Sequence, residues 1–403
     1  MLTYEQARNK VIEQVAKNAG PRPTQNLTVW TALGYVLAQE VKTDREYPPF
    51  DRSTRDGYAV HALEITPGET LRCAGEIKAG DAVTEALAPG TCVQIMTGAA
   101  VPSGADAVAM IEHTQRIADA IRFERPARPG QNIVSRASEA AAGAILLQPG
   151  TRLGYAELAL AAQVGAANLR CSTKPRVAIL STGDEVVLVD ETPGPFQIRN
   201  SNSVSLAAQV HIAGGEPIIL GNAADRPDDL GDKIERGLQE DALVLSGGVS
   251  MGKYDLVESV LKAMGAEFHF DAVAIRPGKP TVFATCQGKP VFGLPGNPVS
   301  TMVTFELFVA PAIDLLSGAA ARALPLVQAK LAEALNEKPG LAHFLPAKIH
   351  WNNSLPIVRA LKWQGSGDLA ALAQSNCFLV IPADREVIPV GEDVCVILRK
   401  DVI

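Results

Sequence analysis

RVAILSTGDE, residues 176–185, is an apolar run followed at once by hydroxyl groups, a glycine and two acids. The same order recurs in ALVLSGG at 242–248 and PVFGLPG at 290–296, with helix-like segments between these runs. Short β-rich runs that alternate with helical ones are typical of βαβ units, which build a mostly parallel sheet covered by helices on both faces. The sequence therefore predicts a three-layer α/β domain over residues 174–319.

Three further regions surround this domain. Residues 1–43 and 141–173 predict a helical linker domain, whose first helix is capped by Thr3 and Gln6 and whose second spans about Thr28 to Glu40. Residues 44–140 consist of strand-like runs split by Gly-Pro turns and predict a β domain inserted into the linker. Residues 320–403 are again strand-like and predict a small C-terminal β barrel.

The composition excludes several classes of protein. The 403 residues are 47% hydrophobic, which is enough for several buried cores. Six cysteines without a CxxC pair predict buried thiols in a reducing compartment, so we expect a cytoplasmic protein. A net charge of −7 without a basic block argues against nucleic-acid binding. The sequence has neither a signal peptide nor a run of about 18 uncharged apolar residues, so no membrane attachment is expected.

The loops after the predicted strands form the candidate site, because ligands bind at the carboxyl ends of strands in open α/β sheets. Glycines there let backbone amides approach a phosphate, and hydroxyls add donors. A tight strand-to-helix turn would explain SGGVSMG at 246–252 equally well. The candidate phosphate-binding residues are Ser181, Thr182, Gly183, Ser246, Gly247, Gly248 and Ser250.

Three acids, Glu185, Asp225 and Asp255, follow strands at the same edge. Each alone would be read as a solvated loop residue, but two unit charges about 4 Å apart interact by about 4 kcal/mol at an effective dielectric of about 20. A divalent cation would neutralise the cluster, and hard oxygen ligands favour Mg²⁺. Arg276 and Lys279 in RPGKPT would cover a bound anion, although ordinary surface charge also explains them.

Two other segments are distinctive. In LPGNPVS, at 294–300, Pro295 makes the strand exit rigid, Asn297 is a potential N-cap and Pro298 suits the first helical position. Such a helix N-terminus favours an anion, although for this segment alone a plain helix start is the better interpretation. GSGDLAA, at 365–371, lacks the βαβ unit of a dinucleotide site and is interpreted as a phosphate-contacting or domain-closing loop.

Several segments resemble, in order over nearly the whole chain, the molybdopterin molybdenumtransferase (MoeA) family, which includes the E domain of gephyrin. They are DGYAV, QIMTGAAVPSGADAV, ILSTGDE, LSGGVSMGKYD, RPGKP, FGLPGNPVS and GSGDL. The resemblance implies a homodimeric enzyme with a divalent cation that inserts molybdate into adenylylated molybdopterin, releases AMP and forms molybdenum cofactor. It implies a cleft built from the α/β domain of one subunit and the β domain of the other, and names molybdopterin adenylyltransferase as a candidate partner.

The resemblance also assigns roles by position. The implied catalytic residues are Asp56, Thr97, Glu185, Asp225 and Asp255, of which Glu185, Asp225 and Asp255 would hold the metal. The implied molybdate-binding residues are Arg276, Lys279, Pro295, Pro298 and Ser366.

Three positions depart from the family pattern. Arg55 replaces the usual methionine and could pair with Asp56 and hold it ionised. Leu341 replaces an arginine expected near molybdate, and Glu139 is followed by alanine instead of aspartate. The alternative function is a non-catalytic dimeric scaffold that binds molybdopterin, and a magnesium-dependent nucleotidyltransferase ranks last. Retention of the other charged loop positions favours the enzyme.

Overall fold

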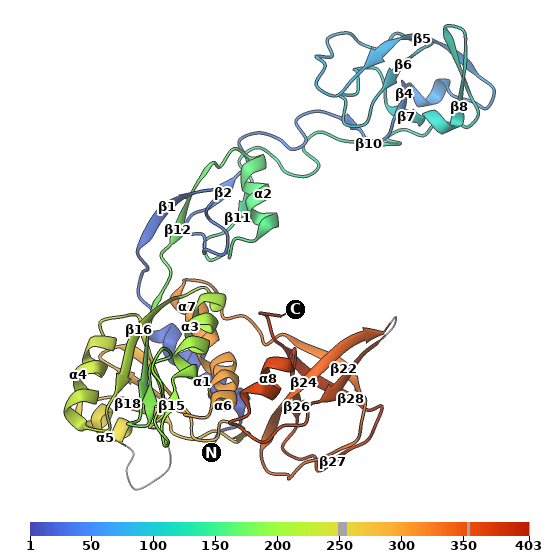
Figure 1. Cartoon of the computed structure of the whole chain (residues 1–403). Helices are drawn as coiled ribbons and strands as arrows, with labels where there is room; N and C mark the ends of the chain where they lie inside the picture. Colours follow the sequence, from blue (N-terminus) through green and yellow to red (C-terminus); the bar gives the residue numbers. More distant parts are fainter. Residues whose placement is uncertain (249–255, 353–354, 403) are drawn as a thin grey trace.

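The α/β domain is built on a six-stranded sheet in the order β16-β13-β17-β21-β20-β18 (Figure 1). The computed structural model describes residues 1–248, 256–352 and 355–402. Strands β16, β13, β17 and β21 are parallel, whereas β20 and β18 add antiparallel to the edge, so the mostly parallel sheet is confirmed. The strands are β13 (Arg176–Thr182), β16 (Glu216–Ala223), β17 (Ala242–Ser246), β18 (Glu267–Phe270), β20 (Val282–Cys286) and β21 (Lys289–Leu294).

Helices cover both faces of this sheet, as predicted. Val177 and Ile179 of β13 lie in one buried cluster with α3, α6 and α7, and Ala178 and Leu180 lie in another with α4 and α5. Successive side chains of a strand point to opposite faces, which is why β13 is apolar throughout. The helices are α3 (Ser201–Ala213), α4 (Pro227–Gly237), α5 (Leu256–Ala263), α6 (Pro298–Thr304) and α7 (Ala310–Leu316).

A π-helical segment, Phe305–Val309, joins α6 to α7 into one helical run. By length and composition the run Pro298–Leu316 could cross a membrane, but an 18-residue stretch of it is 83% buried inside the protein. This burial identifies it as a core helix.

The first helix, α1 (Tyr4–Asn18), begins at the predicted capping box of Thr3 and Gln6. Its apolar stripe of Ala7, Val11 and Val15 is buried in the same cluster as the α/β sheet. Helix α1 therefore lies against the α/β domain, whereas the sequence placed it with the linker.

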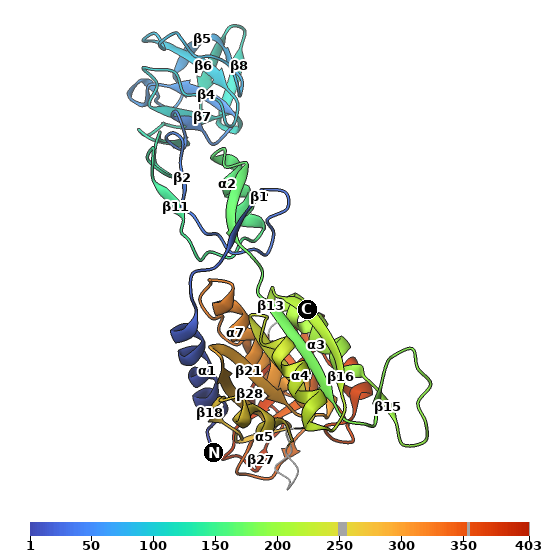
Figure 2. The ribbon, with the colours of Figure 1, turned by 90° about the vertical axis from the view of Figure 1, so that its left-hand side faces the viewer.

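The remaining linker residues form a narrow connection away from the α/β domain (Figures 1 and 2). The pairs β1 (Thr24–Thr28) with β12 (Asn168–Ser172) and β2 (Val41–Lys42) with β11 (Ile145–Leu147) are antiparallel, and α2 (Tyr155–Gln163) covers them.

The predicted helix over residues 28–40 is wrong. The backbone amides of this segment bond to distant chain instead, with Leu37 N–H donating to Thr151 O at 2.8 Å and Ala38 N–H to Arg170 O at 2.8 Å. Gly34 has a φ of 79°, which ends any helix there. Tertiary pairing therefore overrides the local helical pattern.

The inserted β domain is confirmed and lies at the far end of the linker (Figures 1 and 2). Its sheet has the order β7-β4-β6-β5-β9-β8. The strands are β4 (Gly57–Val60), β5 (Thr70–Ile77), β6 (Thr91–Ile95), β7 (Ala107–Met110), β8 (Thr114–Ile117) and β9 (Ala120–Phe123), and β3 (Arg52–Ser53) pairs with β10 (Ile133–Val134) at its base.

The C-terminal region forms the predicted barrel, because β24 pairs with both β25 and β26 and closes the ring β24-β25-β22-β28-β26. β19 (Ile275–Arg276) leaves the α/β domain and pairs with β24, which ties the two domains together. The remaining elements are β22 (Leu326–Leu331), β23 (Leu335–Asn336), β24 (Ala342–Asn352), β25 (Leu355–Ala360), α8 (Leu369–Gln374), β26 (Cys377–Ile381), β27 (Val387–Ile388) and β28 (Asp393–Leu398).

Candidate functional site

A cavity of about 1040 Å³ lies at the carboxyl ends of the parallel strands β13, β16 and β17. Many of the residues predicted from separate loops line this one cavity. They are Ser181, Thr182, Gly183, Glu185, Asp225, Ser246, Gly247, Gly248, Pro295 and Pro298. Ser250 and Asp255 lie outside the described residues.

The glycine turn after β17 fits tightly against the end of β13. Gly247 and Gly248 have φ values of 94° and 66°, and a Cβ on Gly248 would lie 2.8 Å from Thr182 Oγ1. Only glycine satisfies both requirements without strain. Thr182 Oγ1 is buried and has no hydrogen-bond partner in the described structure, so it is a polar group of the cavity wall that remains unsatisfied there.

The hydroxyls of the two predicted serines are used inside the protein. Ser181 Oγ bonds to Asn200 Oδ1 at 3.2 Å and to Ser203 Oγ at 2.9 Å. Ser246 Oγ accepts from Asn202 Nδ2 at 2.8 Å. These hydroxyls organise the cavity wall.

Asn202 is a cavity residue that the sequence analysis missed. Its Nδ2 also donates to Gly296 O at 2.7 Å, so it joins two of the loops, and its Oδ1 is buried and has no partner among the described residues. The available signal was the polar segment RNSNS at 199–203, which runs from the end of β15 (Ile198–Arg199) into the first turn of α3.

The acids at this edge repel one another. Burial is the largest cause that raises the pKa of Asp225 above its ordinary value, followed by the charges of Asp184 and Glu185. Asp184, also missed in the sequence, accepts from the Asp225 backbone N–H at 3.1 Å through Oδ1. Within the described residues no group of three or more His, Cys, Asp or Glu side chains forms a complete metal site.

The two residues predicted to bind molybdate, Arg276 and Lys279, do not line the cavity, although Lys279 directly precedes a residue that does. Arg276 and Lys279 are exposed, and Pro280 between them and β20 lines the cavity. Arg276 stands opposite His343 in the β19–β24 pair, and the Ala342 N–H donates to Ala274 O at 3.0 Å. The departure at Leu341 therefore places an apolar side chain in the segment next to Arg276.

The GSGDL loop closes onto the LPGNPVS corner. Asn297 Nδ2 donates to Ser366 Oγ at 2.9 Å, and the Val299 N–H donates to Ser366 O at 3.0 Å. Asn297 stands at the N-cap of α6 but its side chain makes no cap bond, which corrects the predicted capping role. Gly367 and Leu369 line the cavity, so this barrel loop has the domain-closing role that the sequence suggested.

Asp56 and Thr97 lie together in the β domain. Asp56 Oδ1 accepts from the Thr97 N–H at 2.7 Å and from Thr97 Oγ1 at 2.8 Å, and these bonds hold the pKa of Asp56 below its ordinary value. The residue after Asp56 must be glycine, because a Cβ at Gly57 would lie 1.9 Å from Ala109 O of the neighbouring strand.

Two expectations for Asp56 change. No ion pair joins Arg55 to Asp56 in this fully described segment, so Thr97 and not Arg55 favours the ionised carboxylate. Within one chain the structure does not bring Asp56 to Glu185, because β4 and the cavity-lining strands lie at opposite ends of the molecule (Figure 1).

Known proteins share this whole architecture. The molybdopterin molybdenumtransferase of Nostoc sp. is 35% identical over 98% of this chain and 94% of its own length. The chain belongs to the molybdopterin molybdenumtransferase family. Its residues 2–165 match the model of the MoeA N-terminal region (domain I and II), 178–315 that of a probable molybdopterin binding domain, and 328–398 that of the MoeA C-terminal region (domain IV).

Further relatives of the molybdenumtransferase family agree. The Haemophilus influenzae molybdopterin molybdenumtransferase is 34% identical over 98% of both chains. A molybdopterin biosynthesis MoeA protein from Pyrococcus horikoshii OT3 superimposes with a TM-score of 0.81 at 29% identity, over 99% of this chain and 100% of that one.

Proposed function

We propose that this protein inserts molybdate into adenylylated molybdopterin, releasing AMP and forming molybdenum cofactor. The observation that carries the proposal is the single cavity in which the glycine turn, the unpartnered Thr182 hydroxyl and the acids Glu185 and Asp225 meet. Its volume of about 1040 Å³ is at the upper end of ligand sites, as a pterin nucleotide requires.

Different residues would bind the two anionic reactants. The Gly247 N–H already donates to Leu294 O at 3.0 Å. Gly248 and Thr182 also line the cavity, and their backbone amide and hydroxyl would contact the phosphates of the nucleotide. Arg276 and Lys279 would attract molybdate and offset the repulsion between two anionic reactants.

Mg²⁺ is the proposed cofactor, and Glu185 and Asp225 are the described residues that would hold it. The raised pKa of Asp225 reflects burial and uncompensated negative charge, which a cation would relieve, and carboxylates are the hard ligands Mg²⁺ prefers. When bound, the ion would supply polarisation of the phosphoanhydride. The carboxylates would also orient the attacking water by accepting its protons in hydrogen bonds.

A cytoplasmic homodimer is proposed as the working form. Asp56 and Thr97 lie far from the cavity of their own chain, so they can take part only if the β domain of a second copy reaches that cavity. A molybdopterin adenylyltransferase would supply the substrate, because the reaction consumes an adenylylated pterin.

The test supplies purified protein with adenylylated molybdopterin, molybdate and Mg²⁺. We expect stoichiometric AMP release and a product that reactivates a molybdenum-free apoenzyme. Tight binding of the pterin nucleotide without AMP release at saturating molybdate would instead identify the scaffold. Pyrophosphate release from ATP and molybdopterin would identify a nucleotidyltransferase.

A further inference from the structure

The β domain is attached to the rest of the molecule through few covalent links. We call residues 24–172, which hold the linker strands, α2 and the β domain, the arm, and we call α1, the α/β domain and the barrel the body. The chain passes between body and arm only at residues 19–23 and 173–175. One backbone hydrogen bond, from the Thr173 N–H to Pro23 O at 2.9 Å, joins the two crossings, and side-chain contacts at this junction can further restrict the direction in which the arm points.

Arg152 reaches from the arm into the body. Its Nη1 donates to Gly34 O at 2.9 Å within the arm, and its Nη2 donates to Asp314 Oδ1 at 3.0 Å on α7. The Asp314 side chain is only 2% exposed, and an ionised carboxylate so deeply buried needs charged partners. The arm thus supplies part of the charge that the body requires.

Arg322 completes this cluster from the body side. Its Nε and backbone N–H both donate to Asp314 Oδ2 at 3.0 Å, and its Nη2 lies 2.7 Å from Oδ1. Asp314 therefore keeps a charged partner if Arg152 is removed. This arrangement separates the role of Arg152 in the junction from the stability of the body.

Gly214 at the end of α3 makes room for Arg152. It has a φ of 97°, and a Cβ at this position would lie 2.5 Å from Arg152 Nη1. The negative end of the α3 dipole also favours a cation there. The guanidinium is therefore confined by sterics on one side and by Asp314 on the other.

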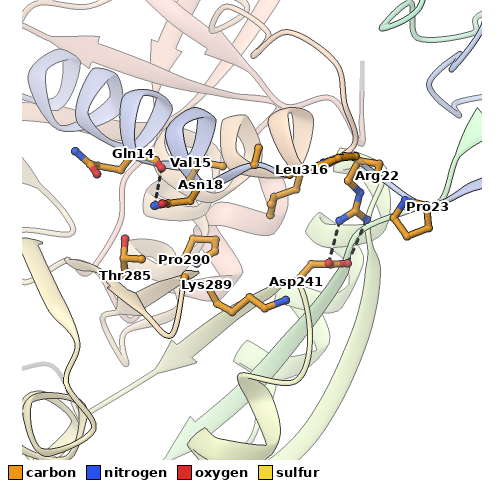
Figure 3. Close-up of a pocket in the computed structure, with 14 residues that line it drawn as sticks. Gln14, Val15, Asn18, Arg22, Pro23, Asp241, Thr285, Lys289, Pro290 and Leu316 are labelled. Atoms are coloured by element: carbon orange, nitrogen blue, oxygen red, sulfur yellow. Dashed lines mark hydrogen bonds and ion pairs between the residues drawn. The ribbon is translucent and has the colours of Figure 1, made fainter.

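A second contact, shown in Figure 3, fixes the two chain crossings to each other. Arg22, in the first crossing, donates from Nη1 and Nη2 to Asp241 at 2.9 and 3.2 Å. Asp241 Oδ2 also accepts from the Arg176 N–H at 2.8 Å, directly after the second crossing. One carboxylate before β17 thus holds both connections to the arm.

We propose that the Arg152–Asp314–Arg322 cluster and the Arg22–Asp241 pair are positioning residues that fix the arm direction and so deliver Asp56 and Thr97 to the cavity of a second copy. This inference rests on the proposed function. A small rotation at the junction is amplified at the far end of the arm, and a displacement of about 1 Å at a reacting centre can cost about 100-fold in rate.

The experiment compares full-length wild type with Arg152→Met, which leaves Asp314 paired with Arg322. The matched control is Arg170→Met, because Arg170 is exposed and its side chain donates to Ala38 O inside the arm. Small-angle X-ray scattering reports the arm direction, and steady-state AMP release reports kcat and KM. Arg152→Lys tests rescue by a cation of different shape.

For Arg152→Met we expect a changed distance distribution in scattering and a fall in kcat of about tenfold or more, with KM for the pterin nucleotide within twofold because the body binds it. Arg170→Met should match wild type, and Arg152→Lys should recover part of kcat. An unchanged scattering profile in Arg152→Met overturns the inference, and so does a changed profile with wild-type kcat.

These outcomes are distinct from failure of the proposed function. If wild type itself releases no AMP, the proposed function fails and scattering alone decides whether Arg152 sets the arm direction. If Arg152→Met proves poorly folded, the double variant Arg22→Met with Asp241→Leu, which leaves no unpaired charge in that pair, provides the same scattering and kcat test.

Discussion

Asp225 follows β16 at the carboxyl ends of the parallel strands, and Asp241 precedes β17 at their amino ends; we call these two sides of the sheet the carboxyl edge and the amino edge. The pKa values of the two carboxyl groups are shifted in opposite directions. At the carboxyl edge, burial and then Asp184 and Glu185 raise the pKa of Asp225. At the amino edge burial also opposes ionisation of Asp241, but Arg22, the Arg176 N–H and nearby Lys289 outweigh it and hold the pKa of Asp241 below its ordinary value. The acids at the carboxyl edge repel one another and would favour a bound cation. At the amino edge the negative charge of Asp241 is paired with Arg22 and stabilises the junction.

The largest expected effect is at the carboxyl edge. Glu185→Gln should lower the rate of AMP release by about 100-fold or more, because it removes a proposed cation ligand beside the phosphates. The free energy of unfolding should change by less than about 0.5 kcal/mol. Single-turnover kinetics and urea denaturation measure the two quantities. Glu235→Gln, an exposed residue on α4, is the control, and a loss of stability as large as the loss of rate would return Glu185 to a structural role.

Asp241→Asn should show the reverse pattern. It weakens the charge-assisted bonds to Arg22, and we expect the free energy of unfolding to fall by about 2 kcal/mol. Urea denaturation followed by fluorescence gives this value, with Asp232→Asn on exposed α4 surface as the control. Stability equal to that of wild type would mean that the amino edge does not depend on this pair.

Asp225→Asn should raise the unfolding free energy slightly, by less than about 1 kcal/mol, because it removes a partly buried charge and its repulsion from Asp184 and Glu185. The same substitution should lower activity, because it removes a proposed cation ligand. Thermal unfolding without metal measures the change. A lower melting temperature in the variant would contradict the interpretation of this edge as electrostatically strained.

Added Mg²⁺ should reduce the difference in stability between Asp225→Asn and wild type. A cation bound between Glu185 and Asp225 stabilises the folded state by mass action, so added Mg²⁺ should raise Tm in wild type and raise it less in Asp225→Asn. Thermal scans across a Mg²⁺ titration, with Na⁺ at matched ionic strength, provide the measurement. Equal shifts in both proteins would place the ion elsewhere.

The smallest expected effect is in pH dependence, and its sign distinguishes the edges. The folded state lowers the pKa of Asp241, so its stabilising contribution is present above the unfolded value of about 3.9 and is lost as pH falls through the folded pKa. The folded state raises the pKa of Asp225, so its destabilising contribution is fully present above that folded pKa and declines to zero as pH falls to the unfolded value of about 3.9. We therefore expect Asp241→Asn to be less stable than wild type at pH 7 and Asp225→Asn to be more stable. Both differences in unfolding free energy should shrink towards zero as the pH is lowered from 7 to about 3.

The carboxyl edge was largely predictable from sequence. Apolar runs such as residues 176–180 give the strands, topology brings the following loops together, and glycines mark where backbone must approach a ligand. The side-chain partners were not predictable, because Ser181 and Asn297 bond to residues that local patterns do not reveal. Whether Asp56 joins the site depends on a second copy of the chain.

The amino edge was not predictable at all. Arg22 and Asp241 are separated by 219 positions, and each alone reads as a solvated charge. The false helix over 28–40 has the same origin, since its amides bond to residues 151 and 170. Sequence patterns report local periodicity, whereas these features depend on distant segments meeting.

The helical run Pro298–Leu316 touches both ends of this arrangement, with Pro298 at the cavity and Asp314 beside the arm. A helix turns by about 100° per residue, since about 3.6 residues complete a turn. Deleting one residue between these points would swing the Asp314 carboxylate away from Arg152 even if every apolar contact re-formed. The number of residues in this helical run, including its π-helical segment Phe305–Val309, therefore fixes the orientation of Asp314 relative to the cavity at Pro298.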